Sequence, residues 1–229
     1  MEAPAFPYRR VVDLSRRLVP GQSEHPWTRF DARVESIVAD PASTPVEGRW
    51  YVVTQLALSG HAGTHVEAPY HALADGAAVG ELPAERWFGQ AVVLDLSDVV
   101  WSAPVDLARL QEAAARAGGI QPGDVVFLRF DWDERATGDG AYPPYPTNEA
   151  LRWLVEQGIK LLGIDSPGLE LPGDRSLTNH RTLFERGIPL IESLTALEQL
   201  RSSRFYVFAA PPPAVGTDAM PLRVLAFEA

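Results

Sequence analysis

Three of the five histidines of this 229-residue chain, His61, His65 and His71, lie within eleven positions, and Glu67 lies among them. An even scatter would place only about a quarter of one histidine in such a window. Neutral imidazoles and a carboxylate form a ligand set that binds divalent transition ions and leaves positions open for water. The segment therefore predicts a metal site. The alternative is an exposed loop whose histidines are incidental.

The spacing within this segment limits how its side chains can meet. One helical turn would place His61 and His65 on the same face, because they are four residues apart. Pro69 disfavours a helix at the residue before it, so we expect the chain to become extended at about Ala68. Side chains two apart share a side of an extended chain, which would keep Glu67 beside His65.

His71 lies two residues beyond Pro69, near enough to the cluster to serve as an acid–base group instead of a metal ligand. A histidine ordinarily titrates near neutral pH, so His71 could protonate a departing nitrogen. A zinc-type ion lowers the pKa of bound water to about 7 and polarises a carbonyl group. Neither a G-x-S-x-G serine motif nor a Gly-rich phosphate loop offers a competing chemistry.

The surrounding sequence indicates the elements that would carry these residues. Apolar and alternating runs predict strands at 9–15, 33–40, 48–60, 90–97, 123–132, 159–168, 188–194, 204–212 and 222–229. Amphipathic runs predict helices at 106–119, 148–158 and 179–187. This order predicts an α/β fold, with a mixed, β-rich sheet core, flanking helices and a single domain over 1–229.

Composition narrows the class of protein. The net charge of −10 and the lack of a basic patch argue against a nucleic acid or an anionic membrane surface as partner. No apolar run is long enough to span a membrane, and no secretory signal is visible. Cysteine is absent, which excludes disulfides and thiolate sites. We expect a cytoplasmic protein that acts on a small molecule.

The segment "HAGTHVEAPYH" at 61–71 resembles the signature H-x-G-T-H-x-D-x-P-x-H of the cyclase family of metal-dependent hydrolases, which includes bacterial kynurenine formamidase and isatin hydrolase. Glu67 stands where the family has aspartate. "VVDLSRRLVPGQSEHPW", "IQPGDVVFLRFDW" and "NHRTLFERGIPLIESL" also resemble family segments and follow in the family's order. The resemblance covers nearly the whole chain and implies the family's swivelling β/β/α-like fold.

The resemblance also implies roles for individual residues. His61, His65 and Glu67 would bind a first metal ion, and Glu67, His180 and Glu192 a second. His71 would be the catalytic acid–base residue. The cofactor would be zinc or manganese, one or two ions per chain, and the protein would be a homodimer or homotetramer.

Glu67 is the one departure from the signature. Its additional methylene moves the carboxylate farther from the backbone, while metal–oxygen bonds stay near 2.0–2.2 Å, about the same for either residue. A bridge must satisfy two such distances at once. We therefore expect occupancy nearer one ion per chain than two; the alternative is that Glu67 bridges two ions.

Further residues are expected around the ion. Thr64 and Asp165 would support the ligands from behind, although Asp165 could equally support a turn. Aromatic side chains are candidates for the wall of a substrate pocket, with plain core or interface as the alternative: Trp27, Phe130, Trp132 and Tyr142. "RFDW" at 129–132 departs from the family's R-T-G-W, so substrate specificity does not transfer directly.

These residues predict a hydrolase that uses metal-activated water to cleave a carbon–nitrogen bond in an amide or cyclic amide of a small aromatic molecule. One alternative is a cyclase or dehydratase of natural-product biosynthesis, which would have the same metal ligands. The other is a catalytically silent small-molecule binding protein, an interpretation favoured by Glu67 and opposed by His71.

Overall fold

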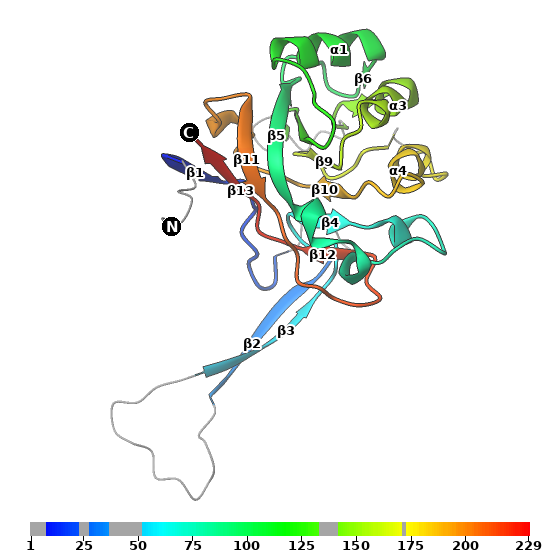
Figure 1. Ribbon diagram of the computed structural model, residues 1–229. Helices are drawn as coiled ribbons and strands as arrows, with labels where there is room; N and C mark the ends of the chain where they lie inside the picture. Colours follow the sequence, from blue (N-terminus) through cyan, green and yellow to red (C-terminus); the bar gives the residue numbers. More distant parts are fainter. Residues whose placement is uncertain (1–7, 23–27, 37–51, 133–141, 171–172) are drawn as a thin grey trace, which may run out of the picture.

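The computed structural model describes residues 8–22, 28–36, 52–132, 142–170 and 173–229 (Figure 1). Their main feature is a nine-stranded sheet with the strand order β1-β13-β11-β5-β7-β9-β10-β4-β12. The central strands β5 (Phe88–Asp95), β7 (Val125–Arg129), β9 (Leu161–Ile164) and β10 (Leu190–Glu192) are parallel neighbours. The sheet is therefore mixed, as the sequence predicts.

Antiparallel strands extend this parallel centre on both sides. One side adds β11 (Arg204–Phe208), β13 (Leu225–Glu228) and β1 (Arg10–Asp13). The other side adds β4 (His65–Glu67) and β12 (Ala219–Pro221), and β4 lies between β10 and β12. The predicted histidine segment thus enters the sheet between two strands that come from much later in the chain.

Helices α1 (Leu107–Arg116), α3 (Asn148–Glu156) and α4 (Thr178–Phe184) pack on one face of the sheet (Figure 1). Side chains two apart on β7 share this face, so Val126 and Leu128 lie in the same buried cluster as the helices. Val125 and Phe127 point the other way, into a second cluster. Two apolar layers therefore hold the central strands rigid.

Capping residues explain where two of the helices begin. The side chain of Asp106 accepts a hydrogen bond from the Arg109 amide at the start of α1, and that of Thr147 accepts one from the Ala150 amide at the start of α3. Each satisfies an amide that would otherwise lack a partner.

A long hairpin leaves the body of the molecule (Figure 1). Its strands β2 (Phe30–Ser36) and β3 (Val52–Leu58) pair only with each other among the described residues. We call it the arm. The remaining elements are a two-stranded sheet of β6 (Pro104–Val105) and β8 (Tyr145–Pro146), and the short 3-10 helices η1 (Pro69–His71), η2 (Val79–Glu81), η3 (Ala84–Trp87) and η4 (Leu197–Gln199).

Most predicted elements are present, but the histidine segment differs from its prediction. It becomes extended at His65 instead of Ala68, because β10 and β12 pair with it on both sides. The link from His61 to His65 is a turn through Gly63, whose φ of +60° lies in the left-handed region, and not a helical turn. Pro69 begins η1, where its missing N–H needs no partner.

The tip of the predicted hairpin, including 37–40 and 48–51, lies outside the described residues. Within the described ranges, no helix has the length and apolar character needed to cross a membrane.

Candidate metal centre

Strand register brings the two distant segments together. β4 and β10 run antiparallel with His65 opposite Glu192 and Glu67 opposite Leu190. Because alternate residues share a side, His65 and Glu67 project together toward the region that Glu192 reaches from the next strand. The distance from His65 Nε2 to Glu192 Oε2 is 3.8 Å. The sheet itself thus assembles half of the site.

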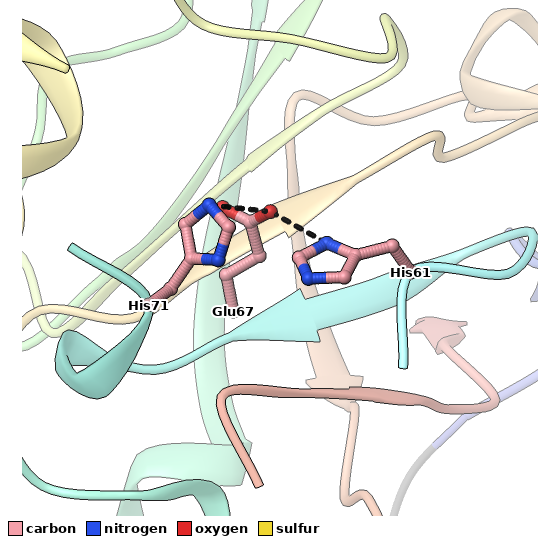
Figure 2. A group of neighbouring side chains, drawn as sticks. All are labelled: His61, Glu67 and His71. Carbon is pink, nitrogen blue, oxygen red and sulfur yellow. Dashed lines mark ion pairs between the residues drawn. The ribbon is translucent and has the colours of Figure 1, made fainter. Parts of the chain in front are cut away.

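The Glu67 carboxylate lies at the centre of the cluster, and its two oxygens face different partners. Oε1 is 2.9 Å from His61 Nδ1, 3.6 Å from His65 Nε2 and 3.7 Å from His71 Nε2. Oε2 is 3.1 Å from His180 Nε2. Figure 2 shows His61 and His71 approaching the carboxylate from the loop before β4 and from η1.

His180 comes from α4 and completes the second side of the cluster. Its Nε2 is 3.6 Å from Glu192 Oε1 in addition to its contact with Glu67. The Glu170 carboxylate holds it in place, because Glu170 Oε1 accepts hydrogen bonds from the His180 amide at 2.8 Å and from the ring Nδ1 at 2.9 Å. All the predicted ligands therefore converge, although over a hundred residues separate the two segments.

Each predicted ligand histidine has an acceptor at its outer ring nitrogen. His65 Nδ1 is 2.8 Å from the Gly63 carbonyl, which can only accept, so the His65 proton lies on Nδ1. His61 Nε2 is 2.9 Å from Asp218 Oδ2. Together with the Glu170 contact to His180, these acceptors orient the three inner nitrogens toward the centre of the cluster, where they could bind a cation. This is the arrangement that metal-binding histidines typically adopt.

The ring nitrogens and carboxylate oxygens that face the centre of the cluster suit contact with a positive ion better than contact with one another. His61 Nδ1 and His65 Nε2 lie 3.2 Å apart, and each would present a lone pair to the other and to Glu67. Among the described residues, the buried oxygens Glu67 Oε2 and Glu192 Oε1 receive no hydrogen bond. An unsatisfied buried carboxylate oxygen is costly, and a divalent cation would satisfy it.

The described residues contain two groups in which all the ligand atoms lie within 4.8 Å of one another. One group is His65, Glu67 and Glu192, and the other is His61, Glu67 and His71. Both contain Glu67. Both groupings differ from the division that the family resemblance implies, because the first joins His65 to Glu192 and the second includes His71, the expected acid–base residue.

Without an ion, the surrounding carboxylates raise the affinity of the histidines for protons. Burial alone would lower the pKa of His61, but Glu67 and Asp218 outweigh it and raise that pKa to about 9. For His180, Glu170, Glu192 and Glu67 overcome burial and raise the pKa to about 12. Burial opposes ionisation of Glu67, yet His180, His61 and His65 hold its pKa well below the usual value. Protons and metal ions would therefore compete for the same atoms.

The cluster opens into a cavity of about 430 Å³. His61, Glu67, His71, His180 and Glu192 form its floor. Its walls come mainly from 142–143, 167–170 and 173–174. A cavity of this size accommodates a small molecule. Among the four predicted pocket aromatics, Tyr142 lines it.

Thr64 lies behind the cluster and joins three segments of backbone. Its hydroxyl donates to the Ser193 carbonyl at 2.6 Å and accepts from the Arg16 amide at 2.8 Å. Thr64 thereby fixes the start of β4 against the residue that follows Glu192.

Asp165 supports a turn, the second of its two predicted roles. Its carboxylate accepts hydrogen bonds from the amides of Phe130 and Asp131 after β7. Burial raises the pKa of Asp165 to about 7, although these amide hydrogen bonds oppose the shift.

Two predicted pocket aromatics lie elsewhere. Phe130 is 1% exposed and continues the alternation of Val126 and Leu128 into the core beneath the helices, so its prediction as a pocket wall is wrong. Trp132 stacks on Trp101 at 5.0 Å between ring centroids and does not line the cavity. Trp27 lies outside the described residues.

Two carboxylates at the site were not predicted, Glu170 and Asp218. Neither lies in a motif with metal-ligand spacing, and each reaches its histidine only through the tertiary fold. The sequence offered no local signal for either.

Comparison with known proteins finds relatives that match nearly the whole chain. Kynurenine formamidase of Salinibacter ruber is 29% identical over an alignment that covers 96% of this chain and 98% of that protein. Kynurenine formamidase of Erythrobacter litoralis is 28% identical over 92% of this chain and 90% of its own length.

Isatin hydrolase A from Labrenzia aggregata, solved with bound benzyl benzoate, matches the fold with a TM-score of 0.78 at 28% identity, over 96% of this chain and 93% of that one. The family model described as "Putative cyclase" matches residues 12–171, well over half of the chain. The resemblance inferred from the signature is therefore confirmed, and the chain belongs to this cyclase family.

Proposed function

We propose that this protein is a metal-dependent hydrolase of a carbon–nitrogen bond, in an amide or cyclic amide of a small aromatic molecule. The observation that carries the proposal is the Glu67 carboxylate, which has three histidine nitrogens around one oxygen and His180 beside the other. The names of the relatives, kynurenine formamidase and isatin hydrolase, support amide hydrolysis as the chemistry.

We propose zinc or manganese as the ion, held by His61, His65, Glu67, His180 and Glu192. The extra methylene of Glu67 led us to expect one ion per chain, but the positions of its oxygens support two. Oε1 faces His61 and His65, while Oε2 faces His180 and receives no hydrogen bond. Glutamate in this backbone position therefore has the reach to serve both sides.

The chain's own residues have defined tasks in such a reaction. A divalent ion bound here would supply a Lewis acid that activates water for attack on the carbonyl carbon. As the carbon–nitrogen bond breaks, His71 Nε2, which faces the cluster, would donate a proton to the departing nitrogen. The products are a carboxylate and an amine, which remain joined when the substrate is a cyclic amide.

Tyr142 and the adjoining wall at 167–170 would bind the aromatic part of the substrate. Tyr142 is 54% exposed, so it offers its ring to a molecule in the cavity.

The test is hydrolysis of an aryl formamide and of isatin by protein loaded with zinc or manganese. We expect at least one to be consumed with uptake of water, and chelator to abolish the turnover. Consumption without uptake of water would instead favour a cyclase or dehydratase. Binding without any turnover would favour a silent binding protein.

We further propose that the protein is a homodimer or homotetramer. On β3 of the arm the side chains from Val53 to Leu58 are all exposed, and Leu56 is 58% exposed. Isolated two-stranded hairpins are marginally stable in water, so contact with a second copy would stabilise this one. Analytical ultracentrifugation of wild type and of Leu56→Ser tests the proposal: we expect an oligomer that the substitution weakens. The cytoplasmic location stays a prediction.

A further inference from the structure

Asp218 lies directly before β12, where the sheet fixes its backbone beside the histidine segment. β12 pairs with β4 so that Ala219 is opposite Glu67, and the Asp218 carbonyl accepts a hydrogen bond from the Ala68 amide at 2.8 Å. The position of this aspartate is therefore set by strand pairing, like that of Glu67 itself.

A single oxygen of Asp218 contacts two histidines from different elements. Oδ2 is 2.9 Å from His61 Nε2 and 3.1 Å from His71 Nδ1. The two rings lie side by side, with 4.8 Å between their centroids. Because an ionised carboxylate only accepts, both ring nitrogens that face it must donate.

The chain before His61 is shaped to allow this contact. A Cβ atom on Gly60 would lie 2.6 Å from the carbonyl oxygen of Ala219, closer than real Cβ atoms come. Only glycine lets this segment approach β12 so closely. The approach places His61 against Asp218.

The two hydrogen bonds decide which nitrogen of each ring faces the cluster. With the proton on His61 Nε2, the other ring nitrogen, Nδ1, faces Glu67 at 2.9 Å. A proton on His71 Nδ1 leaves Nε2 as the atom that exchanges a proton, 3.7 Å from Glu67. Glu170 differs from Asp218, because its ring contact is to His180 alone among the described histidines.

We propose that Asp218 is a positioning residue that sets the ring orientation and tautomer of both His61 and His71 through one carboxylate oxygen. It couples a metal ligand to the acid–base residue, so that the two rings keep a fixed relation. The roles of the two histidines rest on the proposed function, but the shared contact does not.

The first test is metal affinity of Asp218→Ala, measured by titrating metal-free protein with zinc. Loss of a partner behind a metal-binding histidine typically costs 10–100-fold in affinity, so we expect a decrease of about that size. Asp218→Asn keeps one oxygen that can accept, and we expect it to recover part of the loss. Asp75→Asn is the matched control, because the substitution removes the same charge. Asp75 is an exposed carboxylate four residues after His71.

The second test follows His71 separately. In Asp218→Ala saturated with zinc, we expect kcat to stay about 10-fold or more below wild type, with KM much less affected, because the acid–base ring is no longer held. ¹⁵N NMR of the zinc-loaded protein should show His71 with its proton on Nδ1 in wild type, and a mixture of tautomers in Asp218→Ala.

Two results would overturn the shared role. If saturating zinc restores full kcat, Asp218 acts on His61 alone; if metal affinity is unchanged, it acts on His71 alone. Should wild type hydrolyse neither test amide, the proposed function fails, while zinc affinity and the NMR tautomers still decide the role of Asp218.

Discussion

The metal cluster and the arm both contain β-strands, and β4 of the cluster follows β3 of the arm in the sequence, yet the two regions are held in opposite ways. His65, Glu67, His180 and Glu192 are each 5% exposed or less, and they are fixed by strands on two sides and by α4. The side chains of β3 from Val53 to Leu58 are exposed. The fold thus fixes the geometry of the cluster within one chain, whereas the described strands of the arm pair only with each other.

Substitution at the centre of the cluster should have the largest effect. Glu67→Gln keeps the size of the side chain but removes the negative charge that the histidines surround. We therefore expect metal affinity to fall by more than about 100-fold, which exceeds the loss typical when a residue behind a metal ligand is removed. Zinc titration of the metal-free variant measures it. Glu67→Asp, which restores the family's residue, is the control and should retain tight binding. Wild-type affinity in Glu67→Gln would show that the cluster is not organised around this carboxylate.

His71 lies at the edge of the same cluster, so its loss should affect the reaction and spare the metal. His71→Ala should lower kcat by roughly 10²–10⁴-fold, the usual contribution of general acid–base catalysis. Metal content should stay at the wild-type value. Loss of metal would make His71 a ligand, in line with its grouping with His61 and Glu67, and full activity would remove it from the mechanism.

The pH dependence of stability distinguishes a cluster filled by protons from one filled by metal. The pKa of His61 is raised from 6.5 to about 9 in the folded, metal-free protein. A raised pKa stabilises the fold fully below the unfolded value and loses that contribution as pH rises through the folded value. We therefore expect the Tm of metal-free protein to fall between pH 6.5 and 9.

Calorimetric scans with and without bound zinc check this expectation. The fall in Tm between pH 6.5 and 9 should be smaller in zinc-loaded protein and in metal-free His61→Gln. The His61→Gln variant is the control for charge repulsion that arises elsewhere in the protein at high pH. A metal-free Tm that is constant or rises over this range would speak against the electrostatic account of the cluster.

The arm should give the smallest effect on the site. Leu56→Ser changes a side chain of the arm, which is not among the cluster residues, so we expect it to weaken the oligomer without altering metal binding. Zinc stoichiometry and affinity should match wild type when measured in parallel with its oligomeric state. A loss of metal in this variant would mean that the arm and the cluster are not independent.

The contrast also explains what could be read from the sequence. Local spacing predicted His61, His65 and Glu67, and periodic apolar runs predicted the central strands and helices. His180 and Glu192 came only through the family resemblance, because the pairing of β10 with β4 has no local signal. Asp218 depends on the pairing of β12 with β4, and Glu170 reaches His180 from the segment after β9; neither was predicted.

Phe130 was misplaced for a different reason. Its position in the alternation after Leu128 sends it into the core, whereas its place near a strand end suggested the pocket. Aromatic character alone does not separate these two environments.

The central claim is that two segments, over a hundred residues apart, bind metal together around Glu67. The most direct test is the number of zinc ions bound by metal-free wild type and by His180→Ala, each refilled under excess zinc and freed of unbound metal. The account predicts two equivalents for wild type and one for His180→Ala, with His61 and His65 retaining theirs. Equal zinc content in the two proteins would contradict it, because His180 would then contribute nothing to the site.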